Sequence, residues 1–416
     1  MSPAARNYLI VTASYWGFTL TDGALRMLVL LHFFKLGTSP FTLAFLFLLY
    51  EAAGIVANLS GGWLALRFGI PRMLAIGQVL QIGGLVMLSA VDPGWTAVAV
   101  VAWVVGAQGL SGLAKDFTKT ASKSAIKATA TETSGDDAAG LLFKWVAWFT
   151  GSKNAMKGAG FFLGGWLLEV FGFQMALWLM AGLIGAILVV GLVSLPAALG
   201  KANASKSMKE LFAKSSGVNL LAAARIFLFG ARDVWFVVGL PVFLYANGWR
   251  FTEVGAFLAV WTIAYGVVQA MAPRLVKRSP DGLSREVPEA RTWSLALVAI
   301  PVVLALLLNV EGLPRPDLVL IAGLMLFGLP FAVNSSLHSY LILAYAGSEK
   351  AAEDVGFYYA ANAAGRLMGT LLSGLLYQWG GITGCLIGSA LMLATCWLMT
   401  LLLPGEAGRR VPQGAS

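Results

Sequence analysis

The chain has 416 residues, of which 58% are hydrophobic and only 12% are charged. A soluble protein of this length carries about a quarter of charged residues, so this composition excludes an ordinary soluble protein. Apolar runs of about 20 residues recur along the sequence, and each is long enough to cross a bilayer. The runs are continuous rather than alternating, which excludes a transmembrane β-barrel. We therefore predict an all-α polytopic membrane protein.

Turn signals and charges divide the sequence into twelve apolar segments. They begin near Tyr8, Phe41, Arg72, Trp95, Leu141, Phe173, Val218, Thr252, Thr292, Asp317, Asp354 and Ile382. Short connections rich in glycine and proline, such as "KLGTSP" and "RFGIPR", separate most of them, as expected of loops. Longer polar connections are predicted at 115–140, 197–217 and 276–291. The start before Tyr8 has no small-residue cleavage site, so we interpret the first segment as a retained helix.

Lysine and arginine are distributed unequally between the two sets of loops. If the N-terminus is cytoplasmic, the loops on that side hold 19 of the 29 basic residues and the opposite loops hold 3. The positive-inside rule therefore predicts that both termini are cytoplasmic. The net charge of +9 is then explained by loop topology, and no nucleic-acid partner is expected. The remaining seven basic residues lie at or within the spans.

An internal repeat relates the two halves of the sequence. The stretch "KGAGFFLGGWLLEVFG" aligns with "RLMGTLLSGLLYQWGG" at a shift of 209 residues, which places Lys157 on Arg366. The same shift matches Gly160 with Gly369, Gly165 with Gly374, Leu167 with Leu376 and Gly172 with Gly381. A shift of 211 matches Asp22 with Asp233 and Gly37 with Gly248. The repeat predicts a six-helix bundle over 1–196, a cytoplasmic linker over 197–217 and a second six-helix bundle over 218–416.

Twelve spans, a 6+6 repeat and a long central loop resemble the major facilitator superfamily. The segment "GGWLALRFGIPR" resembles the loop signature of that superfamily, with Leu66 in place of the usual acidic residue. The positions that match its gating loop are Gly62, Arg67, Gly69 and Arg72. "GFFLGG" at 160–165 resembles the antiporter motif of the fifth helix, with Phe161 where proline is usual. The resemblance implies a pseudo-symmetric major facilitator fold.

Basic residues outnumber acids inside the predicted bundle. The deep cations are Arg26, Lys153, Lys157, Arg225, Arg232 and Arg366, with Lys144 at the cytoplasmic edge. The deep acids are Asp22, Glu51 and Asp233, which are also the candidates for proton exchange. An unpaired charge at the centre of a bilayer costs about 3 kcal/mol or more. The excess of about three positive charges predicts a water-filled site that binds an anion.

The two lysines of the fifth segment are predicted to face the bundle interior. Lys153, Lys157, Gly160 and Gly164 share one helical face, and glycines on a membrane helix mark a close approach of another helix. Pairing with internal acids, or snorkelling of Lys153 to an interface, is the alternative.

The arginines of the first and seventh segments leave two interpretations open. Asp22 and Arg26 have the spacing of an intrahelical ion pair. Alternatively, Arg26 offers its guanidinium to a phosphate-like group while Asp22 restrains it or takes a proton. Arg232, near the middle of its span, is predicted to contact the substrate, and Arg225 fits an interfacial position equally well. Glu51 suits proton exchange or a packing role equally.

Neutral and peripheral groups give weaker signals. Asn154 and Asn334 are predicted to line the cavity, whereas most other polar residues in the spans fit hydrogen bonds between helices. A stripe of lysines follows the fourth segment at positions 115, 119, 123 and 127. Such a stripe is typical of a contact with anionic lipid headgroups, and an electropositive funnel is the alternative. Cys385 and Cys396 have neither metal-ligand nor disulfide spacing, so no metal or cofactor is expected.

Several stretches resemble a narrower family. "TDGALRMLVLLHF", "GLAKDFTKTASKSAIK", "GSKNAMKGAGFFLGG" and "ARDVWFVVGLPVFL" resemble bacterial organoarsenical efflux permeases, the ArsJ family. The resemblance implies export of 1-arseno-3-phosphoglycerate, which a glyceraldehyde-3-phosphate dehydrogenase makes from arsenate, by a monomeric multi-pass carrier of the bacterial cytoplasmic membrane. The substrate would be bound by Arg26, Lys153, Lys157, Arg232 and Arg366 during alternating access, and Asp22, Glu51 or Asp233 would exchange protons if efflux is an antiport coupled to protons.

Other functions remain open from the sequence. An exchanger or importer of another phosphorylated metabolite or organic acid has the same features. A non-transporting membrane sensor with a transporter fold is a different class, and the chain shows no attached sensor domain. No motif indicates an enzyme, and no phosphate-binding loop indicates an ATP motor.

Overall fold

The computed structural model describes residues 3–132, 138–196, 215–277, 279, 282–346 and 351–405. The side chains of 3–5, 59–68, 123–151 and 351–353 lie outside this description. The helices are α1 (Pro3–Lys35), α2 (Pro40–Leu46), α3 (Leu48–Phe68), α4 (Ile70–Ser89), α5 (Ala97–Glu132), α6 (Ala138–Ser194), α7 (Ser216–Phe236), α8 (Gly239–Ala246), α9 (Phe251–Leu275), α10 (Glu286–Leu308), α11 (Pro316–Tyr345) and α12 (Ala351–Leu401). Most of the predicted linker, 197–214, lies outside the described residues.

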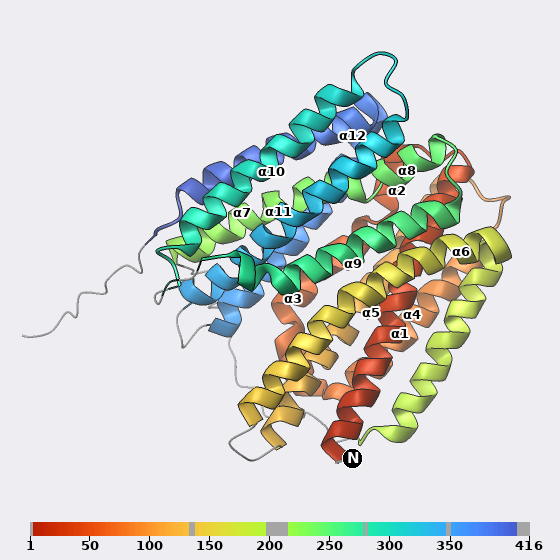
Figure 1. The fold of residues 1–416 in the computed structure, drawn as a ribbon. Helices are drawn as coiled ribbons and strands as arrows, with labels where there is room; N and C mark the ends of the chain where they lie inside the picture. The colour runs from red at the N-terminus through yellow and green to blue at the C-terminus, as the bar shows by residue number, and fades with distance from the viewer. Residues whose placement is uncertain are drawn as a thin grey trace, which may run out of the picture.

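The described residues contain ten apolar helices long enough to cross a membrane, whereas twelve segments are predicted. The difference arises because the two longest helices each contain two predicted segments. α6 departs from helical geometry at Gly172, where φ is 73°, and α12 does so at Gly380 and at Gly381, where φ is 58°. A positive φ of this kind is readily adopted only by glycine. Figure 1 shows α6 turning back at this point to form two neighbouring arms.

The outer part of the seventh predicted segment is interrupted before Gly239. α7 ends at Phe236 and α8 begins at Gly239. The freed backbone N–H groups of Val238 and Gly239 both donate to the Ser373 hydroxyl of α12, at 3.1 Å. A neighbouring hydroxyl thus satisfies the donors that the break exposes inside the bundle.

The predicted polar connection at 115–140 is largely wrong. α5 continues without interruption to Glu132, so the lysine stripe begins inside a helix. The spacing of four residues between lysines, with alanines between them, favours a helix rather than a loop. α10 likewise begins at Glu286, inside the predicted connection at 276–291.

The repeat is visible in how paired glycines pack. A Cβ at Gly160 would collide with the carbonyl oxygen of Leu20 in α1, and a Cβ at Gly369 would lie 2.5 Å from that of Gly230 in α7. A Cβ at Gly165 would collide with Phe251 of α9, and one at Gly374 with Pro40 of α2. Gly160 and Gly369 therefore each contact a helix of their own half. Gly165 and Gly374 each contact a helix of the other half. The turn glycines Gly37 and Gly248 both have φ of 87°.

Substitution at a cross-half glycine is expected to destabilise the protein. Gly165→Ala places a methyl group against the α9 backbone, and overpacking of this kind costs about 1–3 kcal/mol. Gly182→Ala, in the same helix, is the matched control because a Cβ there meets nothing within 4 Å. Thermal unfolding in detergent, followed by tryptophan fluorescence, should show a lower midpoint for Gly165→Ala alone. Equal midpoints for the two variants would contradict this packing.

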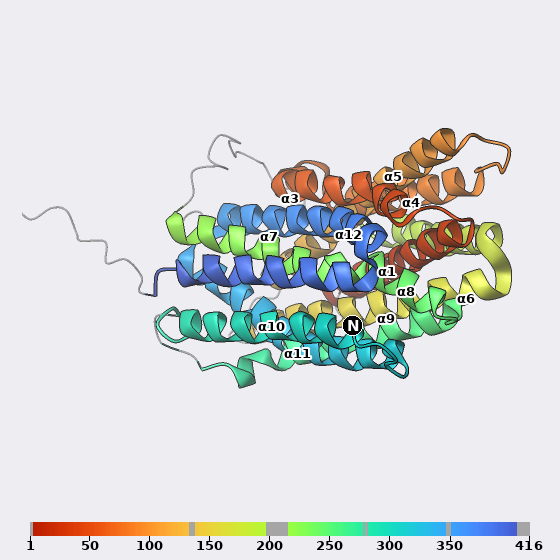
Figure 2. The ribbon, with the colours of Figure 1, turned by 90° about the horizontal axis from the view of Figure 1, so that it is seen from above.

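The helices form two groups that converge at one end. Figure 1 shows α7, α10 and α11 together on one side and α1, α4 and α5 on the other, and Figure 2 agrees. The groups approach each other where α2 and α8 lie, which we call the outer end, and diverge toward the N-terminus, the inner end. The inner end is the one that the distribution of basic residues predicts to be cytoplasmic.

Candidate functional site

A chain of five charged side chains links the two halves near the middle of the helices. Glu51 Oε1 accepts hydrogen bonds from Arg26 Nη2 at 2.7 Å and from Arg366 Nη2 at 2.8 Å. Arg366 Nε also donates to Asp233 Oδ2 at 3.4 Å. Asp233 Oδ1 accepts from Arg232 Nε at 2.7 Å. We call these residues the central ionic chain, and Arg366 is the member that joins a carboxylate of each half.

The acids of this chain are almost completely buried. Glu51 and Asp233 are each 1% exposed, and Arg26 is 9% exposed. Charges at this depth persist only when they are paired and hydrogen-bonded. The pairing is unequal in number, because three arginines share two carboxylates.

Of the two interpretations left open for Asp22 and Arg26, the intrahelical ion pair does not form. Asp22 Oδ1 instead accepts a hydrogen bond from the Tyr50 hydroxyl at 2.6 Å. The Arg26 guanidinium turns toward α3, where it lies 5.2 Å from the ring centre of Phe47 and pairs with Glu51. A buried carboxylate on a neighbouring helix therefore takes precedence over the partner one turn away on α1.

Lys157 points into the bundle, as predicted, and makes no ion pair with any carboxylate whose side chain is described. Its Nζ lies 5.8 Å from the ring centre of Phe161. The charges that act on it include those of Arg366, Arg26 and Asp22. α6 approaches α1 so closely here that a Cβ at Gly23 would lie 2.7 Å from the Lys157 carbonyl oxygen. This contact places the segment of α6 that carries Lys157 against α1, beside Arg26 of the central ionic chain.

Of the other residues predicted to line the cavity, Lys153 and Asn154 lie on α6 near Lys157, and Asn334 lies on α11. Lys153 is half-buried, one turn before Lys157. Asn154 Nδ2 donates to Gln269 Oε1 of α9 at 3.4 Å, so it bridges the two halves. Asn334 is fully buried and donates to the Ser294 hydroxyl of α10 at 2.8 Å. The structure therefore does not bring Asn334 to the central ionic chain.

Part of the lysine stripe faces the bundle, which corrects the expected contact with lipid headgroups. Lys115 Nζ lies 3.8 Å from the ring centre of Tyr50. Lys119 donates to Asn58 Oδ1 at 3.0 Å and pairs with Asp116 at 3.6 Å. Asp116, which is 3% exposed, was not among the predicted acids because its segment was interpreted as a loop. The side chains of 123 and 127 lie outside the described set.

Positive charge is in excess between the helices. Away from the helix ends, the described cations are Arg26, Lys115, Lys119, Lys153, Lys157, Arg225, Arg232 and Arg366. The corresponding acids are Asp22, Glu51, Asp116 and Asp233. Eight cations against four acids leave an excess of four, compared with about three predicted. The side chain of Lys144 lies outside the described ones.

The predicted gating loop is a single-residue turn between α3 and α4. Gly69 has φ of 79°, a conformation that favours glycine. Arg72 is exposed in the first turn of α4. Gly62 and Arg67 belong to the end of α3, and the side chains of Arg67 and Leu66 lie outside the description.

The outer end is closed by contacts between the halves. Glu169 Oε2 of α6 accepts the backbone N–H of Thr252 at the start of α9, at 3.0 Å. Glu169 also lies 3.8 Å from Arg250 Nη1. The Gln378 side chain of α12 accepts the backbone N–H of Phe41 in α2, at 3.3 Å. These contacts have to break for the site to open at the outer end.

Removal of the Glu169 carboxylate is expected to favour outer opening. A hydrogen bond to a charged group is worth about 1.5–3 kcal/mol, and exposure of this group reduces that value. Glu169→Ala should therefore raise the outward-open population several-fold. The measurement is the distance distribution between spin labels at Leu36→Cys and Val310→Cys. Glu253→Ala is the control, since Glu253 contacts Arg250 of its own half. Identical distributions for Glu169→Ala and the unsubstituted protein would contradict the closure.

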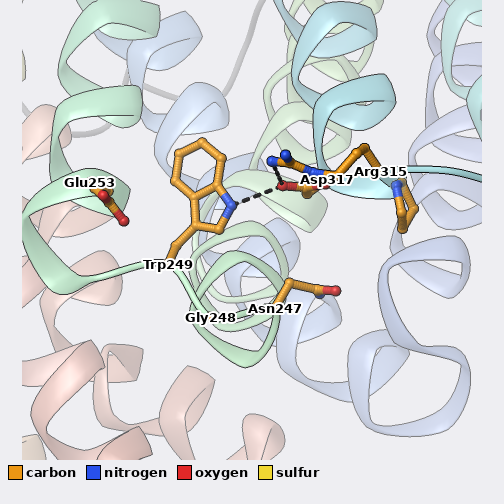
Figure 3. A pocket seen from close by; sticks show the side chains of 7 residues that line it. Asn247, Gly248, Trp249, Glu253, Arg315 and Asp317 are labelled. Atoms are coloured by element: carbon orange, nitrogen blue, oxygen red, sulfur yellow. Dashed lines mark hydrogen bonds and ion pairs between the residues drawn. The ribbon is translucent and has the colours of Figure 1, made fainter.

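A separate cavity of about 640 Å³ opens at the outer end of the second half (Figure 3). It is lined by Asn247, Gly248, Trp249, Glu253, Arg315, Pro316 and Asp317. Asp317 Oδ2 accepts from Trp249 Nε1 at 3.1 Å and from Arg315 Nη2 at 3.0 Å. Because these polar groups satisfy one another, this cavity is a weaker candidate than the central ionic chain.

Comparison with known proteins identifies the fold. No protein-family profile matches the sequence. No curated protein matches it either. A solved structure of a mutant of the nucleoside transporter NupG matches with a TM-score of 0.71 and 15% identity, covering 95% of this chain and 98% of that chain. A structure from work on substrate recognition in proton-dependent oligopeptide transporters matches with a TM-score of 0.67 and 13% identity, covering 96% and 98%.

These matches confirm the predicted fold class. The chain is an all-α, multi-pass membrane protein with the major facilitator fold, and both similar structures are of transporters rather than enzymes. At such low identity the likeness extends to the fold alone. The function of this chain has to be argued from its own residues.

Proposed function

We propose that this chain is a secondary active transporter that carries a small organic oxyanion across the membrane. The observation that carries the proposal is the central ionic chain together with the uncompensated Lys157. In this fold, substrate sites lie near the midplane between the two halves, and the halves rock around them. A cationic excess in that position suits an anionic substrate.

The geometry suggests how an anion would act on the chain. Arginine binds phosphate and similar groups through paired N–H donors, as it binds carboxylate. A substrate oxyanion would compete with Glu51 and Asp233 for Arg366, and Lys157 would add an ammonium group. Since Arg366 joins the two halves, such competition would change the links between them. Substrate binding would thereby bias the rocking equilibrium.

Three buried carboxylates are the candidates for proton exchange. Asp22, Glu51 and Asp233 each accept a hydrogen bond from a side chain that adjoins the proposed substrate site. A carboxylate that loses such a partner to the substrate can take a proton instead. Export in exchange for protons would use one of these groups.

We propose 1-arseno-3-phosphoglycerate as the cargo. The support is the resemblance of four stretches to organoarsenical efflux permeases, together with a positive excess suited to an anion charged at both ends. The proposal includes a glyceraldehyde-3-phosphate dehydrogenase as the source of the substrate, and a monomeric carrier in the bacterial cytoplasmic membrane. The second candidate is another phosphorylated metabolite or organic acid, which the same cations would bind.

The test uses arsenate-sensitive bacterial cells. Arsenic content and resistance are followed with the carrier alone, the dehydrogenase alone and both together. Lower arsenic retention only with both genes, lost in Arg232→Ala at normal membrane expression, is the expected result. No effect of the combined genes would contradict the arsenical cargo and leave the second candidate. Binding without flux for any anion would instead favour a sensor.

A further inference from the structure

A second polar cluster lies inside the second half, apart from the central ionic chain. Its members are Arg225 of α7, Ser335 and His338 of α11, and Tyr358 and Asn362 of α12, which we call the Arg225 cluster. Arg225 lies seven residues before Arg232, about 10 Å along the helix toward the inner end. It is 4% exposed.

Arg225 is a buried cation with neutral partners. Its Nε donates to Asn362 Oδ1 at 2.9 Å, and its Nη1 donates to the Ser335 carbonyl at 3.0 Å. Its Cζ lies 4.0 Å from the ring centre of Phe229 and 5.0 Å from that of Tyr358. No carboxylate among the described side chains pairs with it. Neutral dipoles and rings reduce the cost of burying a charge but leave its net charge in place.

Further polar atoms beside Arg225 lack partners. His338 is fully buried, and neither of its ring nitrogens makes a hydrogen bond among the described residues. It lies three residues after Ser335, on the same face of α11. The buried Tyr358 hydroxyl lies beside the Ser339 side chain but makes no hydrogen bond of good geometry among the described residues. The charge of Arg225 acts on both side chains. A buried polar group left without a hydrogen bond is destabilising.

We propose that the Arg225 cluster binds one small inorganic monoanion, of which chloride is the simplest example. The guanidinium supplies the single positive charge, and the imidazole N–H and phenol O–H supply neutral donors. One cation without lysines suits a monovalent ion, and the burial of Arg225, Ser335, His338 and Tyr358 suits a monatomic one. A water molecule could satisfy the donors but would not neutralise Arg225. The anion would hold α7, α11 and α12 together within the second half.

The test measures anion binding by the purified full chain, without any transport substrate. Chloride replaces gluconate at constant ionic strength, and the unfolding midpoint is followed by tryptophan fluorescence. A saturable rise of about 2–4 °C is expected in the unsubstituted protein. Arg232→Gln should retain the rise because it leaves the Arg225 cluster intact. Tyr358→Phe should weaken the apparent affinity for chloride about tenfold, and Arg225→Gln should abolish the rise of the midpoint.

Two further outcomes decide the proposal. Equilibrium dialysis with radioactive chloride should give about one site per chain, and this measurement stands even if Arg225→Gln fails to fold. Absence of saturable binding to the unsubstituted protein would overturn the proposal. So would binding that is lost in Arg232→Gln and kept in Arg225→Gln, because the anion would then occupy the central ionic chain.

Discussion

Replacement of Arg366 by glutamine is expected to reduce transport at least about a hundredfold. This side chain donates to Glu51 of the first half and to Asp233 of the second, so the substitution cuts the ionic link between the halves. Removing one partner of a buried ion pair costs about 3–5 kcal/mol. It also removes the guanidinium that the substrate is proposed to bind. The measurement is the initial rate of arsenic accumulation in everted membrane vesicles, normalised to the amount of carrier.

The matched control for this prediction is Arg274→Gln. Arg274 is exposed near the inner end of α9, so the substitution changes the charge equally without touching the central ionic chain. Arg366→Lys should keep part of the activity, since a lysine retains the charge but not the fork of donors. If the transport rate of Arg366→Gln stayed within twofold of that of the unsubstituted protein, Arg366 would not be required for transport.

Lys157→Gln is expected to reduce transport strongly without lowering stability. Because no described carboxylate pairs with Lys157, its removal leaves no buried acid unpaired and relieves repulsion from Arg26 and Arg366. The unfolding midpoint should stay equal or rise, while the transport rate falls at least about tenfold. The two readouts separate a substrate-binding role from a structural one, which a loss of activity alone would not do.

Lys277→Gln provides the control, since this lysine is exposed beyond the end of α9. Lys157→Arg should restore part of the transport by returning the charge. A midpoint that falls together with activity in Lys157→Gln would assign the lysine to packing. Full activity in Lys157→Gln would move the substrate site elsewhere.

Hydropathy and glycine patterns were sufficient to predict the fold class. The close approach of Gly160 to α1 and the turns at Gly172 and Gly381 follow from positions that the sequence alone marks. These features are local, because a glycine is needed wherever backbones touch or φ is positive.

The partners of the charged residues were not predictable. Arg26 prefers Glu51 to Asp22, although only Asp22 stands at helical spacing on its own helix. Lys115 and Asp116 were assigned to a loop because the end of an amphipathic helix resembles a polar connection in composition. Which of several buried charges meet depends on how helices distant in sequence cross. Spacing along one helix does not contain that information.

The most direct test of the proposed transport uses everted membrane vesicles that contain the unsubstituted protein. A glyceraldehyde-3-phosphate dehydrogenase outside the vesicles forms the arsenical from glyceraldehyde 3-phosphate, arsenate and NAD⁺. Radioactive arsenic should accumulate inside only when the enzyme and all three reactants are present, and Lys157→Gln vesicles should accumulate it at least about tenfold more slowly. Equal uptake of arsenate without the enzyme, or no uptake in its presence, would contradict export of an organic oxyanion through the central ionic chain.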